Sequence, residues 1–308
     1  MNKLMVITGP TGSGKTKLSL EIAERINNSV IISADSRQIY KYIQLATCSP
    51  KEADLKKIKH YFVNELNPEE EFNAGEFGKH GRDLIQKLFD DGKFPVVCGG
   101  SGLYIKSLID GFFEGESSDS GIRKNLYEKL KDKGNEFLYN ELKEIDKIAA
   151  SKLIPQNIRR IIRALEIYYV TGKKFSDLQN EKSDVNFIPV QYGLLADRKF
   201  LYENINRRVD EMIKEGLIEE IKELKEKGFD KMNLNSLDTV GVKEVFKYLN
   251  GEYNLIEMSE MIKQNTRRYA KRQMTWFRRD ERIKWFNINE DTDFNKLAEK
   301  IINDFKNS

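Results

Sequence analysis

The 308-residue sequence has little cysteine, little histidine and no long apolar run. Its two cysteines, Cys48 and Cys98, and its two histidines fit no zinc-binding pattern and no disulfide framework. No window approaches the roughly 20 apolar residues of a membrane-spanning helix, and the N-terminal apolar run is too short for a secretory signal. These absences predict a soluble, cytoplasmic protein, and a monomer is the default expectation.

Neither sign of charge is in large excess, which bears on the partners the protein can attract. Lys and Arg number 52 against 49 Asp and Glu, giving a formal net charge of +3. A net charge this small does not by itself attract nucleic acid. Binding to nucleic acid therefore requires a local concentration of Lys and Arg. The positions of the positive charges are therefore informative.

Four short apolar segments along the chain predict buried strands. They are residues 4–8, 29–34, 94–98 and 190–196. Each is apolar enough to be covered on both faces, as parallel strands usually are. Residues 15–26 follow the first segment with apolar side chains four residues apart, which predicts a helix. Strands and helices in this order are typical of an α/β fold with a parallel sheet.

A phosphate-binding pattern, G-x-x-x-x-G-K-[ST], lies between the first predicted strand and helix as "GPTGSGKT". Its glycines let backbone N–H groups point at an anion, and the following helix presents its positive end. Lys15 adds a point charge, and the Thr16 hydroxyl can ligate Mg²⁺. Kinases, NTP hydrolases and other transferases all reuse this loop, so the reaction stays open. The residues expected to bind a diphosphate or nucleotide are Gly9, Pro10, Thr11, Gly12, Ser13, Gly14, Lys15 and Thr16.

The other segments predict how the chain divides into domains. Residues 112–188 carry no convincing strand and many charges, and after residue 196 the pattern is helical again. A chain of this length is large enough for two domains. We expect an α/β fold with a P-loop NTPase-like parallel sheet core, formed by residues 1–111 and 189–308 with C-terminal basic helices. A helical insertion domain is expected over residues 112–188.

The residues after the second predicted strand include a candidate catalytic carboxylate. Asp35 lies in "ADSRQIY", at the sheet edge where ligands of open α/β sheets bind. It is a candidate general base for an acceptor nucleophile, or a carboxylate associated with Mg²⁺. The alternative is that Asp35 caps a helix beginning near Ser36.

A further glycine-rich turn, "VVCGGSGLYI" at residues 96–105, follows the third predicted strand. Its three glycines allow close approach of the backbone to a ligand. Ser101 offers a hydroxyl and Tyr104 an aromatic face. Three such turns on one sheet edge indicate a site for two substrates.

Two segments carry concentrated arginine. In "RRYAKRQMTWFRR", residues 267–279, helical projection gathers six positive side chains within about 140°, opposite an apolar and aromatic side. In "NIRRIIRALEIYY", residues 157–169, three arginines gather within about 100°. Both segments are candidates for contact with a phosphodiester backbone, and the alternative for the first is a solvated charged face.

The combined motifs closely resemble those of the tRNA dimethylallyltransferases, also called tRNA isopentenyltransferases. They are "GPTGSGKT", "ADSRQIY", "GGSGLYI", "RRIIRALE" and "RRYAKRQMTWFRR", and the resemblance spans nearly the whole chain. It implies transfer of a dimethylallyl group from dimethylallyl diphosphate to N6 of the adenosine 3′ of the anticodon. The tRNAs would be those that read codons beginning with U, and diphosphate would be released. The resemblance also implies dependence on Mg²⁺ and tRNA as the partner.

The resemblance further implies roles for particular residues. Asp35 corresponds to the general base, and Lys15 and Thr16 would stabilise the departing diphosphate, with Thr16 as the metal ligand. The residues expected to contact tRNA, from the resemblance and the arginine-rich segments, are Asp35, Ser36, Arg37, Gln38, Ser101, Arg123, Arg159, Arg160, Ile161, Ile162, Arg163, Arg268, Arg272 and Arg279.

Three positions depart from the family pattern. Residues 46–50 read Ala-Thr-Cys-Ser-Pro where the family usually has Gly-Thr-Ala-Lys-Pro, and Val242 replaces a frequent tyrosine. Asn204 replaces a usual arginine, which puts one diphosphate contact in question. Arg207 and Arg208 are the candidates to restore that contact.

Three other functions remain open on the sequence alone. An adenylate isopentenyltransferase acting on free nucleotides would need neither the basic segment at 267–279 nor the large insertion. A P-loop kinase of a small molecule would transfer a phosphoryl group instead. A non-catalytic RNA-binding protein would bind tRNA without turnover.

Overall fold

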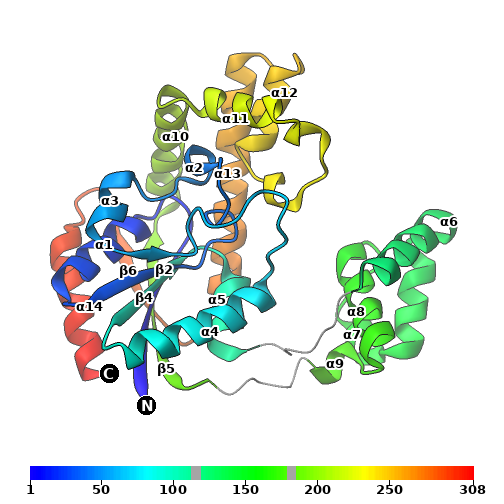
Figure 1. The fold of residues 1–308 in the computed structure, drawn as a ribbon, viewed down its shortest axis with the longest axis horizontal. Helices are drawn as coiled ribbons and strands as arrows, with labels where there is room; N and C mark the ends of the chain where they lie inside the picture. The colour runs from blue at the N-terminus through cyan, green and yellow to red at the C-terminus, as the bar shows by residue number, and fades with distance from the viewer. Residues whose placement is uncertain (112–118, 179–184) are drawn as a thin grey trace. The chain divides into compact units, whose positions relative to one another are not determined.

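The computed structural model describes residues 1–111, 119–178 and 185–308 (Figure 1). The chain divides into two compact units, one made of Met1–Ile109 and Val185–Ser308 and the other of Asp110–Asp184. We call the first the core unit and the second the insertion unit. Within the described ranges, no helix combines the length and apolar character needed to cross a membrane.

The core unit is built on a six-stranded sheet with the order β3-β2-β4-β1-β5-β6. Every neighbouring pair of strands is parallel. The strands are β1 (Asn2–Thr8), β2 (Ser29–Ser33), β3 (His60–Tyr61), β4 (Phe94–Gly99), β5 (Phe187–Ala196) and β6 (Ile283–Ile288). The expected parallel α/β sheet is confirmed, and its four predicted strands are β1, β2, β4 and β5. Because all strands point the same way, the turns after their carboxyl ends share one edge of the sheet.

The sequence did not lead us to expect β3 and β6. β3 is only two residues long. β6 lies after residue 196, where we expected helices alone, so that prediction is wrong. Polar residues such as Lys284 and Asn287 interrupt its apolar pattern, and an edge strand tolerates them because it is paired on one side only. β5 begins at Phe187, inside the range expected for the insertion.

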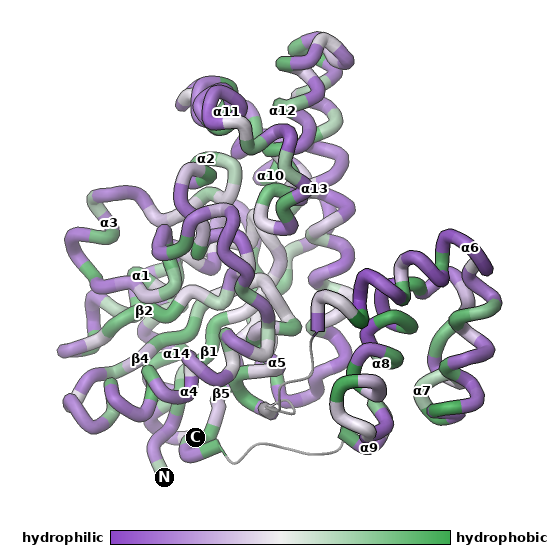
Figure 2. Tube along the Cα trace, turned by 45° about the vertical axis from the view of Figure 1, so that its right-hand side comes forward, coloured by the Kyte–Doolittle hydropathy of each residue, from purple (hydrophilic) through white to green (hydrophobic). Residues whose placement is uncertain are grey.

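Helices cover both faces of the sheet (Figure 1). α1 (Lys15–Arg25) packs with α14 (Phe294–Asn307) on one face, and α4 (Ala74–Asp90) packs with α5 (Gly102–Asp110) on the other. The core beneath α1 and α14 consists of Met5, Ile7, Leu18, Ile22, Val96, Tyr192, Leu194, Ile288, Ala298, Ile301, Ile302 and Phe305. Figure 2 shows hydrophobic residues concentrated in the central strands. Two short helices, α2 (Gln44–Thr47) and α3 (Glu52–Lys57), lie between β2 and β3.

Further helices lie beyond the carboxyl ends of the strands, in the upper part of Figure 1. They are α10 (Arg198–Lys214), α11 (Leu217–Glu226), η1 (Phe229–Lys231), η2 (Asn235–Leu237), α12 (Val242–Leu249) and α13 (Leu255–Phe277). α10 and α13 pack side by side, with Leu201, Ile205 and Ala270 buried in their contact. A capping box of Asn254 and Glu257 starts α13. The two long helices thereby reach the edge where the strands end.

The insertion unit is helical. Its elements are α6 (Ser120–Ile145), α7 (Lys147–Ser151), α8 (Ile158–Thr171) and α9 (Phe175–Leu178). α6 is interrupted at Gly134, where φ is 80°. The unit has its own core, made of Leu126, Leu138, Leu142, Ala150, Ile161, Ile162, Ala164 and Leu165. Residues 112–118, at the start of the range predicted for the insertion, lie outside the described residues.

Candidate active site

Three turns lie at the carboxyl edge of the sheet, after β1, β2 and β4. We call them the phosphate loop (residues 9–16), the Asp35 turn (residues 34–40) and the Ser101 turn (residues 99–104). The Ser36 backbone N–H donates to Ser101 Oγ at 3.0 Å. The Ser101 backbone N–H donates to the Ala34 carbonyl at 3.2 Å. Hydrogen bonds therefore join the Asp35 and Ser101 turns directly.

The strand order makes the boundary between β1 and β4 a topological switch point. The helix after β1 is α1, on one face of the sheet, and the helix after β4 is α5, on the other. Ligands of open α/β sheets bind at such points, outside the carboxyl ends of the strands. The phosphate loop and the Ser101 turn flank this point, and the Asp35 turn adjoins it.

The phosphate loop has the backbone conformation of an anion site. Gly12 and Gly14 have φ of 81° and 82°, which glycine adopts without steric penalty. Gly14 is the N-cap of α1, so the positive end of that helix faces the loop. A Cβ on Gly14 would lie 2.5 Å from the Phe294 ring, so packing also requires glycine there. In the described part of the chain, the buried Ser13 hydroxyl has no hydrogen-bond partner.

Lys15 lies in the loop near several titratable groups. Its Nζ donates to the Pro10 carbonyl at 3.0 Å. Burial lowers the pKa of Lys15 below the ordinary lysine value, and Cys98 and Asp35 act in the opposite direction. An anion bound in the loop would favour the charged ammonium. Lys15 is therefore placed to respond to the charge of a ligand.

Asp35 is half-buried and bonds within its own turn. Its Oδ1 accepts a hydrogen bond from the Arg37 backbone N–H at 2.9 Å. Residues 36–39 form a turn, and the next helix, α2, begins at Gln44. The alternative that Asp35 caps a helix beginning near Ser36 is therefore wrong. The two chemical roles proposed for its carboxylate, as a general base or beside Mg²⁺, stay predictions.

An aromatic part of α13 lies against the other turns. Burial, together with the charge of Asp35, raises the pKa of Tyr269 to about 12, while a hydrogen bond with Ser101 and nearby arginines have the opposite effect. The Tyr269 hydroxyl therefore stays protonated at neutral pH. Trp276 packs directly on the Ser101 turn, since a Cβ on Gly102 would lie 2.1 Å from its indole ring.

The other Asp35-turn residues expected to contact tRNA already have partners in the protein. The Arg37 guanidinium donates to the Asn235 carbonyl. Gln38 Oε1 accepts from the Ser33 hydroxyl at 2.9 Å, and its Nε2 donates to two backbone carbonyls at 3.3 and 3.2 Å. Gln38 thus stabilises the turn from within. Ser36 and Arg37 are half-buried and directly follow Asp35 in the sequence.

The basic segment at 267–279 occupies the C-terminal part of α13 and the residues after it. Its exposed positive side chains are Arg268, Lys271, Arg272, Arg278 and Arg279. α13 ends at Phe277, so the last two arginines lie beyond the helix that the projection assumed. Arg267 differs from the rest because it is half-buried and donates to Asn206 Oδ1 at 2.6 Å. The exposed set forms what we call the α13 basic face.

A buried carboxylate organises two arginines in the insertion unit. Glu166 is 0% exposed and accepts hydrogen bonds from Arg123 at 3.1 Å and from Arg163 at 3.0 Å. The side chains of these arginines remain 42% and 41% exposed. Their charge is partly neutralised, but both still reach the surface. Arg159 and Arg160 are exposed on α8.

Two isoleucines expected in the tRNA-binding run lie inside the insertion unit. The side chains of Ile161 and Ile162 are 0% and 3% exposed and belong to its core. Helical periodicity places them on the face of α8 that packs, away from Arg159 and Arg160. Their side chains serve the core of the unit, and the arginines of this run are the residues whose side chains reach the surface.

α10 supplies polar groups beside the phosphate loop. Asn204 Nδ2 donates to the Gly12 carbonyl at 3.4 Å, and Arg208 Nη1 donates to Thr11 Oγ1 at 3.4 Å. Arg207, the other candidate replacement for the usual arginine, is exposed and donates to Asn204 Oδ1 at 2.8 Å. Arg208 is therefore the α10 cation that contacts the loop.

Sequence reasoning did not select Gln273, which links two of the turns. Its Oε1 accepts from the Thr11 backbone N–H at 2.8 Å, and its Nε2 donates to the Gly100 carbonyl at 2.9 Å. These partners are 262 and 173 residues away in sequence, so no local pattern points to them. The one available signal was a polar residue between the buried Ala270 and Phe277.

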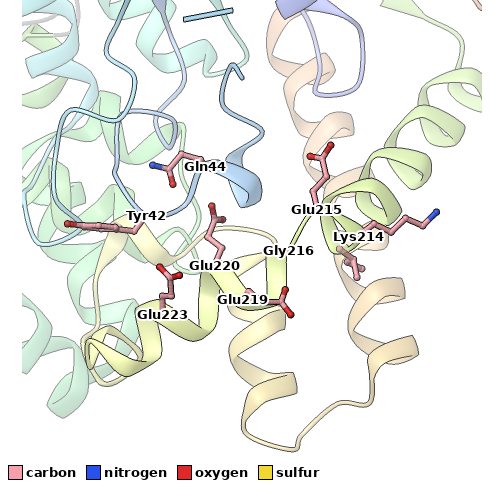
Figure 3. Close-up of a pocket in the computed structure, with 9 residues that line it drawn as sticks. Tyr42, Gln44, Lys214, Glu215, Gly216, Glu219, Glu220 and Glu223 are labelled. Atoms are coloured by element: carbon pink, nitrogen blue, oxygen red, sulfur yellow. The ribbon is translucent and has the colours of Figure 1, made fainter. Parts of the chain in front are cut away.

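An acidic cavity of about 670 Å³ lies apart from the three turns, beside α2, α10 and α11 (Figure 3). Its lining residues are Tyr42, Gln44, Ile213, Lys214, Glu215, Gly216, Glu219, Glu220 and Glu223. The four glutamates would repel a phosphate. Glu220 has a structural partner, because its carboxylate accepts from the Leu45 and Ala46 backbone N–H groups at 2.8 and 3.0 Å. We therefore place the candidate active site at the three turns.

The donor set of the site fits Mg²⁺ bound largely through a ligand. The described residues include no group of three or more His, Cys, Asp or Glu placed to hold a metal. Mg²⁺ commonly takes one or two protein oxygens and completes its shell with water and substrate phosphates. Thr16, at the start of α1, and Asp35, whose charge acts on Lys15, offer oxygens of that kind.

Known proteins are similar in sequence to this chain along nearly all of its length. The family described as IPP transferase matches residues 38–280. A tRNA dimethylallyltransferase of Alkaliphilus oremlandii is 46% identical over 310 residues, covering 99% of this chain and 97% of that protein. The tRNA dimethylallyltransferase of Acetivibrio thermocellus is 46% identical over 312 residues, with 99% and 97% covered.

Solved structures share the fold. The tRNA isopentenylpyrophosphate transferase of Bacillus halodurans superposes with a TM-score of 0.72 at 34% identity, covering 100% of this chain and 98% of that one. A eukaryotic dimethylallyltransferase acting on tRNA superposes with a TM-score of 0.86 at 29% identity, covering 100% of this chain and 80% of that one. The likeness therefore extends across both units of the chain.

Proposed function

Since this chain belongs to the IPP transferase family, with tRNA dimethylallyltransferases among its relatives, we propose that it transfers a dimethylallyl group from dimethylallyl diphosphate to tRNA. The acceptor is N6 of the adenosine 3′ of the anticodon in tRNAs that read codons beginning with U. Diphosphate is the second product. The enzyme is thus a prenyltransferase that modifies tRNA.

The meeting of an anion loop and a carboxylate at one switch point supports this proposal most strongly. Lys15 and the α1 N-terminus suit a diphosphate, and the charge of Asp35 acts on Lys15. The Ser101 turn is bonded to the Asp35 turn and flanked by aromatic residues of α13. The site therefore offers separate places for a leaving group and for an incoming base.

The proposed reaction breaks a carbon–oxygen bond and leaves the phosphorus centres unchanged. The N6 lone pair forms a bond to C1 of the dimethylallyl group. The C1–O bond breaks, and its electron pair leaves with the diphosphate. The Asp35 carboxylate takes the N6 proton as general base. Lys15, Arg208 and the loop N–H groups stabilise the charge that grows on the departing oxygen.

Thr16 and Asp35 are the residues that would help to hold Mg²⁺. When bound, the ion neutralises charge on the diphosphate and so makes it a better leaving group. Positive charge also comes from Lys15, from Arg208 at Thr11, and from the N-terminus of α1. These protein groups would add to the charge neutralisation that the ion supplies.

tRNA binding is assigned to arginines on both units. A stacked adenosine cannot reach the sheet edge unless it leaves the stack, and extrusion requires contacts that hold the backbone on either side. The α13 basic face lies on the helix that carries Tyr269 and Trp276 to the Ser101 turn. We assign to the insertion unit, with Arg123, Arg159, Arg160 and Arg163, a second contact with the tRNA backbone. The core unit then carries the catalytic site.

Replacing Arg272 and Arg279 by glutamine is expected to weaken tRNA binding and to flatten its salt dependence by about one to two units of slope. The reason is that each lost phosphate contact releases about one counterion fewer. The measurement is tRNA affinity at several salt concentrations. The control removes two exposed lysines from α14, Lys296→Gln with Lys300→Gln, and should leave the slope unchanged. An unchanged slope in the arginine variant would mean that the α13 basic face does not contact phosphate.

The affinity for dimethylallyl diphosphate is expected to fall as the pH rises through the pKa of Lys15. In the free protein this pKa lies below the ordinary 10.5, and the protonated form is the one that binds the anion. Affinity is therefore full below that pKa and declines above it. The ligand itself does not titrate in that pH range, because phosphate groups lose their last proton at about pH 6.

Calorimetric titration with dimethylallyl diphosphate at a series of pH values from about 7 to 10 measures this decline. This pH range lies below the reference pKa of lysine. Lys15→Arg is the control, because its guanidinium stays charged throughout. Its affinity should be almost independent of pH over the same range. A parallel decline in both proteins would assign the titration to another group.

Incubation with labelled dimethylallyl diphosphate and Mg²⁺ tests the proposed activity. The acceptor is either unmodified tRNA or free AMP, ADP and ATP. We expect label in tRNA alone. Label in free nucleotides would favour an adenylate isopentenyltransferase, and phosphoryl transfer from ATP without prenylated tRNA would favour a kinase. Binding of tRNA without any turnover would favour a non-catalytic RNA-binding protein.

A further inference from the structure

Gln273 is a buried polar residue that the proposed chemistry does not use. It lies in α13 and is 6% exposed. Both ends of its side-chain amide are bonded to backbone groups, Oε1 to the Thr11 N–H at 2.8 Å and Nε2 to the Gly100 carbonyl at 2.9 Å. One side chain thus spans the phosphate loop and the Ser101 turn.

Glutamine suits this position for reasons of chemistry and space. Its amide presents an acceptor and a donor side by side, which match a backbone N–H and a backbone carbonyl. A carboxylate would offer acceptors alone, and an apolar side chain would leave these two backbone groups without the partners that Gln273 gives them. Gly100 leaves room for the amide, since a Cβ there would lie 2.3 Å from Gln273 Nε2.

The two bonds fix geometry on both sides of the switch point. The Thr11 N–H is bonded to Gln273 and is therefore turned towards α13, which ties this residue of the loop to the helix. Gly100 immediately precedes Ser101, whose hydroxyl accepts from the Ser36 N–H beside Asp35. The spacing between the diphosphate loop and the turns that carry Asp35 and Ser101 therefore depends on Gln273.

We propose that Gln273 is a positioning residue for the transfer. It holds the phosphate loop in register with the Asp35 and Ser101 turns, so that the reacting carbon of the diphosphate ester faces the incoming N6. This inference rests on the proposed function. Gln273 acts through Thr11 and Gly100 and touches neither substrate. Its effect falls on kcat, because each substrate keeps its own contacts when their relative placement is lost.

Gln273→Met removes both hydrogen bonds and keeps a side chain of similar length. We expect kcat to fall by about 10²-fold, as a misplacement of about 1 Å does, while KM for each substrate changes by less than about threefold. Gln264→Met is the matched control, since Gln264 is exposed on the same helix. Thermal unfolding of both variants reports whether they fold. A folded Gln273→Met enzyme with wild-type kcat, or a loss carried by KM alone, would overturn the proposal.

Gln273→Glu adds a signature that a merely structural role would not produce. The protonated carboxyl offers one acceptor and one donor, as the amide does, whereas the carboxylate has no donor for the Gly100 carbonyl. Burial favours the protonated form. The ratio of Gln273→Glu activity to wild-type activity should therefore rise as the pH is lowered, and the ratio for Gln273→Met should stay flat. A flat ratio for both variants would contradict the assignment.

Amide hydrogen exchange of Thr11 tests the link without any assay of transfer. The Thr11 N–H should exchange at least about tenfold faster in Gln273→Met than in wild type or Gln264→Met, because its partner is gone. Unchanged exchange would show that Gln273 does not hold the loop. Failure of wild-type enzyme to prenylate tRNA would remove the proposed function, and this exchange result would still decide whether the link exists.

Discussion

Asp35→Asn is expected to lower the turnover of tRNA prenylation by about 10² or more while leaving tRNA affinity nearly intact. Asparagine keeps the side-chain oxygen that accepts from the Arg37 N–H at 2.9 Å, so the turn should persist. It cannot take the N6 proton. The measurement pairs single-turnover rates with tRNA binding. Asp35→Ala should lose at least as much activity, because it also removes the acceptor in the turn.

Titration with Mg²⁺ separates the two chemical roles of Asp35. If Asp35 mainly holds the ion, a higher Mg²⁺ concentration should restore part of the activity of Asp35→Asn by mass action. If Asp35 is the base, no concentration should restore it, and this is the result we expect. Equal losses in turnover and tRNA affinity would contradict both roles and would indicate that Asp35 serves the turn or contacts RNA.

Lys15→Met is expected to lower turnover by about 10²- to 10³-fold, the size of effect seen when a group that stabilises developing charge is removed. Methionine keeps the apolar stem but cannot neutralise the departing diphosphate. The same substitution at Lys17, exposed on α1 over the Phe294 ring, is the matched control and should have little effect. Initial rates with saturating tRNA and varied dimethylallyl diphosphate measure both variants.

The balance between kcat and KM in Lys15→Met shows what the loop does. A loss mainly in kcat means that Lys15 acts on charge that develops as the C1–O bond breaks. A loss in KM alone would mean that the loop binds diphosphate equally well in the ground state and in the transition state. Wild-type turnover in the variant would exclude Lys15 from the reaction altogether.

Much of the core could be predicted because parallel strands leave regular traces in sequence. β1, β2 and β4 are short apolar runs, and each is followed by polar or glycine-rich residues. Strand direction alone places the phosphate loop, Asp35 and Ser101 on one edge, and the order β2-β4-β1 then makes them neighbours. β6 was missed because Lys284 and Asn287 break its apolar run, as an edge strand allows.

The long-range partners could not be predicted in the same way. Gln273 bonds to backbone groups of Thr11 and Gly100, and backbone groups carry no residue-specific signal. Arg208 was one of two candidates on α10, and helical position decided between them, since Arg207 is exposed and Arg208 contacts Thr11. Such choices depend on how α10 and α13 pack, and local sequence does not determine this.

The sequence predicted the exposed positions of the arginines in the insertion unit but not all of their partners. Exposed arginines on α8 agree with the helical projection, but the projection did not include the buried Glu166 that binds Arg123 and Arg163. Arg163 and Glu166 are three residues apart on one helix, which is a recognisable pairing signal. Arg123 lies 43 residues from Glu166, and tertiary packing alone brings them together.

Mapping the modified atom in tRNA tests the central claim most directly. Wild-type enzyme is incubated with dimethylallyl diphosphate, Mg²⁺ and an unmodified tRNA that reads a codon beginning with U, and the product is digested and analysed by mass spectrometry. We expect one dimethylallyl group on N6 of the adenosine 3′ of the anticodon, and none when that adenosine is replaced by guanosine. A dimethylallyl group at another position, or prenylation that survives the replacement, would contradict the account.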